Sequence, residues 1–441
     1  MSNSGYPAPS EWSAHISRRS LLKGSVAAAA TVALGGGVLA ACGDGGVALG
    51  SSSGALTIGS NASDAAPQAG LKAIVDAFMA QNSEISATIN TLDHNTYQEN
   101  ITNILKAGED DVLAWFAGFR NKFFADQGQL GDISDVWDSV SGLGEGFKTA
   151  STASDGKQYF MPTSYYTWAV NYNKDVFSEM GYTEPQTMDE LKALAGRMQS
   201  DGITPFAFAN DGKWPIMGTF DILNMRINGY DFHVDLMGGD ESWTDARVKN
   251  VFTAWEELLP FHQEGANGRT WQEGAQALQD GTAGMHLLGT FEASHSEELA
   301  DKMDFFNFPE IDSSVGASAL DAPIDGFQMI ADPSNPAAAK ELLLFMSTKE
   351  AQNAYLSEDP SVVASSSEAD TSTYNALQKK SAEFANAATG ISQFLDRDTI
   401  PDFAGKCGDM FAEFIEDPSK VDGLLTDLED QKVAIFDDFN S

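Results

Sequence analysis

The sequence is poor in cysteine, basic residues and long apolar runs, and these shortages exclude several classes of protein. Its 441 residues include two cysteines, too few for a disulfide framework. Lysine and arginine total 26 against 64 acidic residues, a formal net charge of −38. Such a charge repels nucleic acid and anionic lipid, and it disfavours anionic ligands unless a local basic pocket exists. It suits solubility in a salty medium, although acidic exported proteins in general share it.

Motifs for nucleotide, metal and nucleophile chemistry are missing as well. The six histidines are scattered, and the sequence has no P-loop, H-E-x-x-H or Cys/His metal pattern. Residues 50–54 formally match the G-x-S-x-G motif, but no hydrophobic strand precedes them, so we interpret them as low complexity. We expect no cofactor, no metal and no nucleic-acid partner.

The first 41 residues are predicted to be an export signal. Residues 17–23 have the twin-arginine pattern, and an uncharged Ala/Gly-rich segment follows at 25–40. That segment is shorter than the ~20 residues of a comfortable bilayer span. Residues 39–42 form a lipoprotein cleavage box, so Cys42 is the expected lipid site and 42–54 a flexible tether. A short anchor that is never removed is the alternative. Lipidation of Cys42 would leave Cys407 unpaired, as a packed and inert thiol.

The rest of the chain is long enough for two lobes, and it alternates strands with helices. Apolar periodicity predicts strands at 55–60, 85–92 and 111–117 and helices at 71–81 and 97–106. This βαβαβ order predicts a parallel sheet, and such sheets bind ligands at the carboxyl ends of their strands.

Two loops at these strand ends carry candidate ligand-binding residues. Asn61 and Asp64 follow the first strand, and Phe116 and Arg120 follow the third. An arginine can donate to neighbouring hydroxyl groups, and an aspartate can accept from them. A surface salt bridge is the alternative role for Arg120. Trp115 is expected in the core because it lies inside the strand.

Residues 158–175 are crowded with aromatic and β-branched side chains, which favour extended chain. Pro162 is predicted to end one strand, and a second strand is expected to begin near Tyr166. Hydroxyl groups and two rings lie between them, among which Tyr165 and Tyr166 are candidates for stacking on a ligand. An ordinary buried strand pair is the alternative.

This segment, continued to Phe177, resembles the crossover of family 1 extracellular solute-binding proteins, the sugar-capturing receptors of ABC importers. The stretch from Trp271 to Phe291 resembles the family more strongly, in the pattern Trp-x-Glu-Gly-x-x-x-Leu-x-x-Gly-x-Ala-x-Met followed by Gly-x-aromatic. The capping signal at 185–191 and the helix that starts at Asn335 match the family too.

The resemblance implies a two-lobed periplasmic-binding-protein fold. Each lobe would be a mostly parallel α/β sheet flanked by helices, and hinge crossovers would join the lobes. The first lobe is expected at 55–165 plus 303–360 and the second at 166–302 plus 361–441. In this arrangement strands at 303–309 and 324–331 return to the first lobe, and one helix runs from 336 to about 356.

The resemblance also nominates residues on the second lobe's side of the cleft. Trp214 lies on a polar turn after a predicted strand, where an exposed ring suggests a sugar platform. Its alternative role is to cap the core of its own lobe. Phe291 lies where the family usually has a sugar-stacking tryptophan. Its ring is smaller than that of tryptophan, so the identity of the sugar can differ from the family's usual one. Glu292 follows Phe291 as a candidate acceptor.

Three further candidates lie nearer the carboxyl terminus. Asp325 is in a segment that forms a cleft loop in the family, with a structural turn as the alternative. Asp396 and Arg397 belong to a cluster of rings and charges that could complete the cleft. An internal salt network with Asp398 is the alternative.

We therefore expect an extracytoplasmic, lipid-anchored, monomeric receptor, not an enzyme, that binds a carbohydrate (an oligosaccharide or a glycoside) and delivers it to ABC permease subunits. One alternative keeps the receptor but binds a compatible solute or a polyamine, which would need an acidic pocket with aromatic walls. A remote alternative is an exported glycan hydrolase, which needs two carboxylates about 5–10 Å apart. No acid/base signature surrounds Asp64, Glu292, Asp325 or Asp396.

Overall fold

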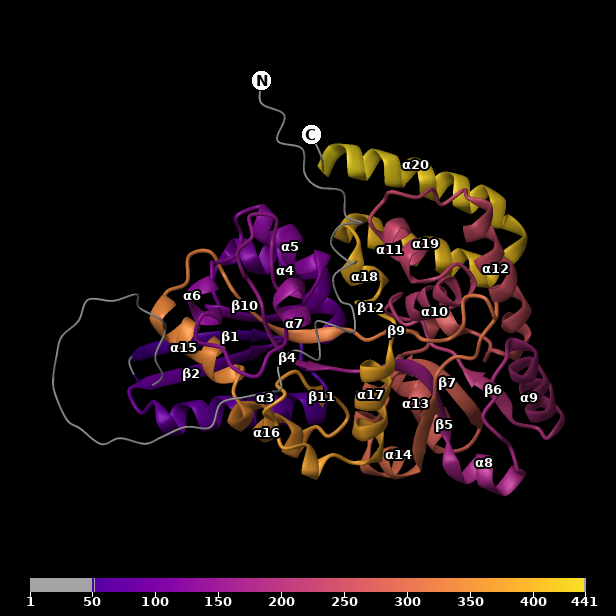
Figure 1. Cartoon of the computed structure of the whole chain (residues 1–441), viewed down its shortest axis with the longest axis horizontal. Coiled ribbons are helices and arrows are strands. Elements are labelled where there is room, and N and C mark those ends of the chain that lie inside the picture. Colours follow the sequence, from indigo (N-terminus) through magenta and orange to yellow (C-terminus); the bar gives the residue numbers. More distant parts are fainter. Residues whose placement is uncertain (1–49, 51, 440–441) are drawn as a thin grey trace.

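The computed structural model describes residue 50 and residues 52–439, which form two α/β lobes side by side (Figure 1). The first sheet contains, in spatial order, β11 (Val363–Ala364), β4 (Met161–Tyr165), β10 (Ile324–Met329), β3 (Val112–Phe116), β1 (Gly54–Ser60) and β2 (Ile85–Thr91). The second contains β6 (Thr204–Ala207), β7 (Ala283–Gly289), β5 (Trp168–Asn173) and β8 (Met303–Phe306). A separate parallel pair consists of β9 (Ala319–Asp321) and β12 (Gly390–Ser392). The two-lobed α/β fold is confirmed.

Helices flank both sheets. Those of the first lobe are α3 (Ala65–Gln81), α4 (His94–Ala107), α5 (Phe119–Asp126), α6 (Ser134–Trp137), α7 (Glu145–Ala150), α15 (Pro336–Met346) and α16 (Lys349–Glu358). The second lobe has α8 (Lys174–Met180), α9 (Met188–Ser200), α10 (Met217–Ile227), α11 (Tyr230–Met237), α12 (Ala246–Leu258), α13 (Trp271–Gln279), α14 (Glu297–Lys302), α17 (Ala376–Ala387), α18 (Leu395–Asp398), α19 (Pro401–Glu416) and α20 (Val421–Phe439).

Local sequence explains the elements that form the first lobe's side of the cleft. The apolar face predicted for 71–81 is buried in α3, and α3 begins earlier, at Ala65. α4 begins at His94 rather than at 97, because the Asp93 carboxylate accepts a hydrogen bond from the amide of Thr96. The strands β1, β2 and β3 are parallel, so their carboxyl ends meet at one edge of the sheet.

The chain crosses between the lobes three times: from β4 to β5, from β9 to β10, and after β11. The strands that follow the first two crossovers run antiparallel to their neighbours in the sheets that they join. β5 is antiparallel to β7 and β8, and β10 is antiparallel to β3 and β4. The sheets are therefore mixed, and the crossover segments form the base of the cleft.

Three details of the predicted organisation are corrected. Pro162 does not end a strand but lies inside β4, beside a bulge in the pairing with β10, where the missing N–H is tolerated. β8 pairs with β5, so the strand predicted at 303–309 belongs to the second lobe. The helix predicted from 336 to 356 is broken at Ser347, and Thr348 caps the second piece, α16.

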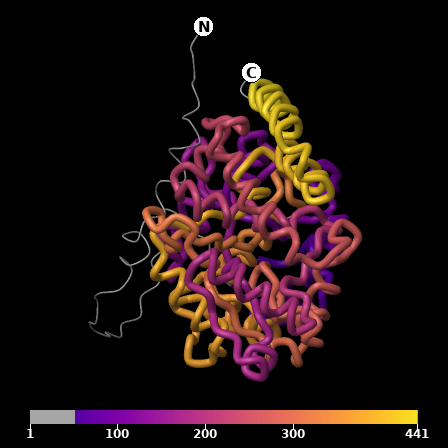
Figure 2. Tube along the Cα trace, turned by 90° about the vertical axis from the view of Figure 1, so that its right-hand side faces the viewer, coloured from indigo at the N-terminus to yellow at the C-terminus, as the bar shows by residue number. Residues whose placement is uncertain are grey.

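The second lobe has a core rich in stacked rings, over which the C-terminal helices pack. Phe220 stacks on Trp243 and on Phe411 of α19. Cys407 is fully buried in the same cluster. α20 extends along this lobe as a long helix at the edge of the molecule (Figures 1 and 2). Within residues 50 and 52–439, no helix combines the length and apolar character that crossing a membrane requires.

Candidate functional site

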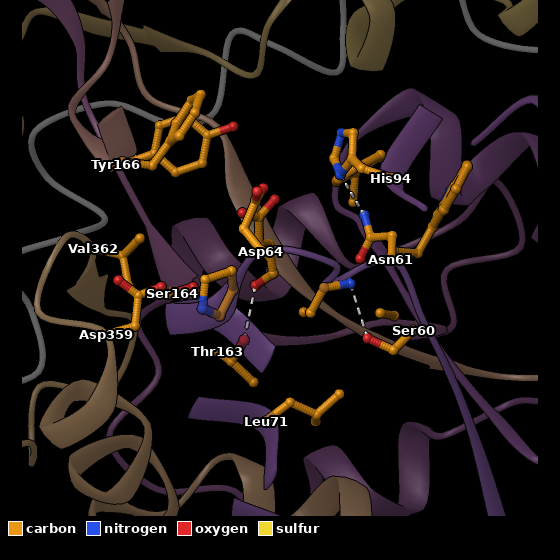
Figure 3. Close-up of a pocket in the computed structure, with 18 of the residues that line it drawn as sticks. Ser60, Asn61, Asp64, Leu71, His94, Thr163, Ser164, Tyr166, Asp359 and Val362 are labelled. Carbon is orange, nitrogen blue, oxygen red and sulfur yellow. Dashed lines mark hydrogen bonds between the residues drawn. The ribbon is translucent and has the colours of Figure 1, made fainter. Parts of the chain in front are cut away.

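A cavity of about 170 Å³ lies between the two lobes, and Figure 3 shows many of the side chains that line it. Both lobes and the crossover segments contribute. The first-lobe side consists of Ser60, Asn61, Ala62, Ser63, Asp64, Pro67, Leu71, His94, Gln98, Ala114, Trp115, Phe116, Thr163, Ser164, Asp325, Gly326, Phe327, Tyr355, Asp359 and Val362. The opposite side consists of Tyr166, Trp168, Trp214, Trp271, Phe291, Ser294, Phe394, Asp396 and Arg397.

The polar side of the cavity follows from the sheet topology. Asn61 and Asp64 come directly after β1, His94 comes after β2, and Phe116 ends β3. Because the three strands are parallel, these side chains meet at one edge, as expected for a ligand site of this architecture.

Arg397 is the central charge of the cavity and connects the lobes. Its Nη1 donates to Oδ1 of Asp325 at 2.9 Å, and its Nη2 donates to the hydroxyl of Tyr166 at 3.0 Å. The guanidinium also lies 3.9 Å from the centroid of the Phe116 ring. Burial raises the pKa of the Asp325 carboxyl, and the charge of Arg397 opposes that rise. Arg397 is thereby held in place by contacts on three sides.

A second ion pair lies beside the cavity. Nη1 of Arg120 donates to Oδ2 of Asp396 at 3.0 Å and to Oε1 of Gln98 at 2.8 Å. Oδ1 of Asp396 is buried without a hydrogen-bond partner among the described residues, and it lies 3.9 Å from Nε of Arg397.

Polar contacts continue from Arg120 towards the strand ends. Gln98 Nε2 lies 2.6 Å from Nε2 of His94, and Nδ1 of His94 lies 3.3 Å from the amide of Asn61. Burial, with a further contribution from the positive charge of Arg397, lowers the pKa of His94 to about 4. The imidazole is therefore neutral at physiological pH.

The other side of the cavity is an aromatic wall, which we define as Trp168, Trp214, Trp271, Phe291 and Phe394. Neighbouring rings within it meet at centroid distances of 4.6 to 6.3 Å. Edge-to-face contacts such as that of Trp271 with Phe291, at 83°, hold the ring planes in fixed directions.

Phe394 has a strained backbone within this wall. Its φ of 100° lies in a region that favours glycine, and the residue immediately precedes α18, which carries Asp396 and Arg397. Such strain costs about 1–3 kcal/mol and is found where a site must be held in one geometry. It places the Phe394 ring on Trp168 and the start of α18 at the cavity.

Direct contacts join the lobes at the mouth of the cavity. Gln272 Nε2 donates to Oδ1 of Asp64 at 3.1 Å, and Trp214 Nε1 donates to Oδ1 of Asn95 at 3.2 Å. With the Arg120–Asp396 and Arg397–Asp325 pairs, they hold the two lobes in contact around the cavity. The structure is that of a closed cleft.

Nine of the twelve predicted ligand-binding residues line this cavity: Asn61, Asp64, Phe116, Tyr166, Trp214, Phe291, Asp325, Asp396 and Arg397. The alternatives also find support: Arg397 is in ion pairs with Asp325 and Asp396, and Trp214 packs against the hydrophobic core of its own lobe.

The other three predicted residues do not line the cavity. Arg120 lies behind the cavity, in a neighbouring groove, with its guanidinium on Asp396 and Gln98. Tyr165 is absent from the cavity lining and packs its ring on Phe147. Glu292 is fully buried in the second lobe, where its carboxylate contacts Nδ1 of His286 at 2.6 Å and accepts from Asn171 at 2.7 Å.

Sequence reasoning overlooked His94, Gln98, Trp168, Trp271 and Phe394. The strand-end rule that nominated Asn61 and Phe116 applies equally to His94, which follows β2, the second of the three strands along the chain. Trp271 was visible as the first residue of the family-like motif. No local signal distinguishes Phe394 from a core residue. Nowhere in residues 50 and 52–439 do three or more His, Cys, Asp or Glu side chains gather as a metal site.

Comparison with known proteins adds family evidence to this geometry. The profile of a bacterial extracellular solute-binding protein matches residues 61–353, and the profile of a twin-arginine translocation signal matches residues 15–35. The second match supports an extracytoplasmic location. An uncharacterized ABC transporter extracellular-binding protein of Pyrococcus horikoshii is 26% identical over 268 residues, which are 58% of either chain. A probable sugar-binding periplasmic protein of Rhizobium meliloti is 27% identical over 200 residues, 42% of this chain and 45% of that one. The chain thus spans about half the length of the curated relatives it matches.

Solved structures extend the similarity over nearly all of the folded part. The bacterial solute receptor AcbH, described as having an exclusive substrate preference for β-D-galactopyranose, is 42% identical with a TM-score of 0.86, covering 87% of this chain and all of that one. A chitin oligosaccharide binding protein shares the fold at 19% identity and a TM-score of 0.77, over 87% of this chain and all of its own. With its profile match over residues 61–353 and its closed two-lobed cleft, the chain belongs to the family of bacterial extracellular solute-binding proteins.

Proposed function

We propose that this protein is the substrate-binding component of an ABC importer and that it captures a carbohydrate between its lobes. The observation that carries the proposal is the two-sided cavity, in which an aromatic wall faces hydrogen-bonding groups. Rings stack on the apolar C–H faces of a sugar, while carboxylates, amides and an arginine satisfy its hydroxyl groups. The neutral character of sugars also suits a strongly acidic protein.

The size of the cavity favours a ligand with a single pyranose ring. The sequence alone also allowed an oligosaccharide. The volume of the cavity, about 170 Å³, is below the ~300–1,000 Å³ of pockets for larger, drug-sized ligands. The 42% identity to a receptor with a stated preference for β-D-galactopyranose supports the same choice. We therefore take D-galactose as the first ligand to test.

Binding would work by closure of the lobes. The contacts of Arg120 with Asp396 and of Gln272 with Asp64 join opposite sides of the cleft, so they exist only when it is closed. A ligand that adds contacts to both sides shifts the population towards this form, by no more than its differential affinity for it. The closed shape would then be the form that the permease subunits recognise.

The proposed receptor is anchored to the membrane by a lipid and acts as a monomer. Lipid on Cys42 would hold the protein at the outer face of the cell membrane, and Cys42 lies outside the described residues. We expect a monomer and no turnover of the ligand. Intact mass of the membrane-associated protein would test acylation, because a diacylglyceryl group adds a defined mass to a chain that begins at Cys42.

Isothermal titration of the purified protein tests the function, with D-galactose, D-glucose, a maltooligosaccharide, a compatible solute and a polyamine as ligands. We expect heat and a raised melting temperature with the monosaccharide. Binding of the polyamine alone would favour the alternative of a cationic solute, which Arg397 in the cavity disfavours. Recovery of a sugar with a cleaved bond would favour the hydrolase. Absence of binding by every sugar would overturn the proposal.

A further inference from the structure

We propose that Arg120, although it does not reach the cavity, sets the direction of a hydrogen-bond relay through Gln98 and His94 that makes Asn61 present its NH₂ group, a donor, to the ligand. This inference rests on the proposed function for the identity of the ligand, but the relay itself is a property of the ligand-free protein.

The relay starts from the guanidinium of Arg120, because this group can only donate hydrogen bonds. A guanidinium has donors and no acceptor, so the Gln98 atom at 2.8 Å from Nη1 of Arg120 must be the carbonyl oxygen. The same guanidinium nitrogen is fixed by Oδ2 of Asp396 at 3.0 Å, and Arg120 also lies 4.8 Å from the centroid of Trp115. Gln98 therefore cannot exchange the positions of its oxygen and nitrogen without placing two donors face to face.

The second step assigns the tautomer of His94. With Oε1 held by Arg120, the NH₂ of Gln98 faces Nε2 of His94 at 2.6 Å. A donor at this distance requires an acceptor, so Nε2 carries no proton. Since the imidazole is neutral, its proton is on Nδ1.

The third step assigns the amide of Asn61. The Asn61 atom placed 3.3 Å from Nδ1 of His94 is the amide nitrogen Nδ2, which puts two donors face to face once Nδ1 carries the proton. The oxygen and nitrogen of an amide fill equivalent positions, and the network decides between them. We therefore infer that the amide is turned over, so that the oxygen of Asn61 faces His94 and its NH₂ takes the position that the oxygen has in Figure 3, on the side of the cavity.

Protonation of His94 would not reverse this direction. Asp64, Asp93 and Asp396 favour the charged ring, whereas burial and Arg397 oppose it. In the charged ring Nδ1 still carries a proton, so Asn61 still accepts from it. Arg120 and Gln98 are positioning residues, and Asn61 is the residue that would contact the ligand.

The relay predicts a specific preference at one ligand position. The group next to Asn61 must accept a hydrogen bond, so a hydroxyl or a fluorine is suitable there and a hydrogen is not. Removal of this hydroxyl should weaken binding on the order of tenfold, the value of one hydrogen bond. Fluorine at the same carbon should restore most of the affinity, because it accepts but cannot donate.

Nitrogen-15 NMR of the ligand-free protein labelled at histidine tests the relay without any sugar. The His94 signals are assigned by their loss in His94→Asn. We expect a protonated Nδ1 and an unprotonated Nε2 at pH 7. Gln98→Met removes the donor to Nε2 and should let the other tautomer appear. Gln68→Met, at an exposed position of α3, is the matched control and should leave the tautomer unchanged. An Nε2–H tautomer in the unaltered protein, or a tautomer indifferent to Gln98→Met, would overturn the relay.

A panel of singly deoxygenated and singly fluorinated galactoses then tests the face that Asn61 presents. One carbon should show weak binding of the deoxy sugar and retained binding of the fluoro sugar. Asn61→Asp keeps the acceptor for His94 but replaces the donor by an oxygen, so the fluoro sugar should lose its advantage at that carbon. A panel in which no carbon behaves in this way would overturn the donor assignment. If no sugar binds at all, the proposed function fails, and the NMR result still decides the relay.

Discussion

The two sides of the cleft are built in different ways. The first-lobe side carries polar residues at the ends of parallel strands, beside apolar ones such as Leu71 and Phe327, and the hydrogen bonds of the polar residues have defined directions. The second-lobe side is the aromatic wall, in which rings support one another through edge-to-face contacts. The polar side can therefore discriminate between hydroxyl positions, and the wall can supply contact area that tolerates many sugars. Arg397 belongs to the second lobe but extends to Asp325 on the polar side, so it joins the two.

The largest effect is expected where the two sides meet. Arg397→Met leaves the Asp325 carboxylate and the Tyr166 hydroxyl without their donor inside the cleft. Loss of one partner of such a pair should cost about 3 kcal/mol of stability and reduce sugar affinity by at least about a hundredfold. Urea denaturation and titration calorimetry measure the two effects.

Arg247 offers a matched control for Arg397. It also pairs with a carboxylate, Asp245, and also lies 3.9 Å from a ring centroid, that of Phe232, but it is exposed. Arg247→Met should change stability by less than about 1 kcal/mol and leave binding unchanged. Equal losses in both variants would show that the cleft arginine has no special role.

A change in the aromatic wall should reduce affinity without affecting discrimination among sugars. Trp214→Ala removes a ring that contacts Trp168 and Phe291, at a partly exposed position. We expect a loss on the order of 2 kcal/mol, or about thirtyfold in Kd, equally for every sugar that binds. Trp214→Phe should recover most of it. A variant that changed the ranking of the sugars would contradict the division of roles between the two sides.

The charged groups behind the cavity should give the protein a pH-dependent stability that the wall cannot provide. Burial raises the pKa of Asp398 from 3.8 to about 6. The folded protein then keeps a proton that the unfolded chain releases from about pH 4 upwards, so this contribution to stability is present below about pH 4 and is lost as the pH rises to about 6. Asp398→Asn should reduce the fall in melting temperature between pH 4.5 and 7, while Asp221 and Asp321, whose pKa values burial also raises, retain part of it. Asp427→Asn, on the exposed surface of α20, is the control and should leave the profile unchanged.

The smallest effect is expected at the mouth. Gln272→Leu removes the hydrogen bond to Asp64 and should weaken binding about threefold, mainly through faster dissociation because the closed form is less stable. The control is Gln276→Leu, one turn further along α13, because Gln276 donates only to Asp280 of its own helix end and not across the cleft. Stopped-flow fluorescence measures the dissociation rate. Equal rates in the two variants would remove Gln272 from the closing contact.

Much of the fold was predictable because it depends on local patterns. The apolar period of α3 and the capping residues of α9 and α13 lie within a few residues of the helices they specify. The polar side of the cleft was predictable for a related reason: in a parallel sheet the residue after each strand reaches the same edge. The rule nominated Asn61 and Asp64 after β1, and applied to β2 it would have nominated His94.

The sequence by itself determined the two-lobed α/β plan, the export signal and the presence of polar strand ends and rings. Only the tertiary structure decided that Glu292 turns inward to His286, that β8 joins the second sheet, and that Arg120 contacts Gln98 and does not line the cavity. The reason is separation along the chain: Arg120 and its partner Asp396 are 276 residues apart. Helix periodicity and capping act over a few residues, whereas the choice of a buried charge's partner depends on where the packed lobes place it.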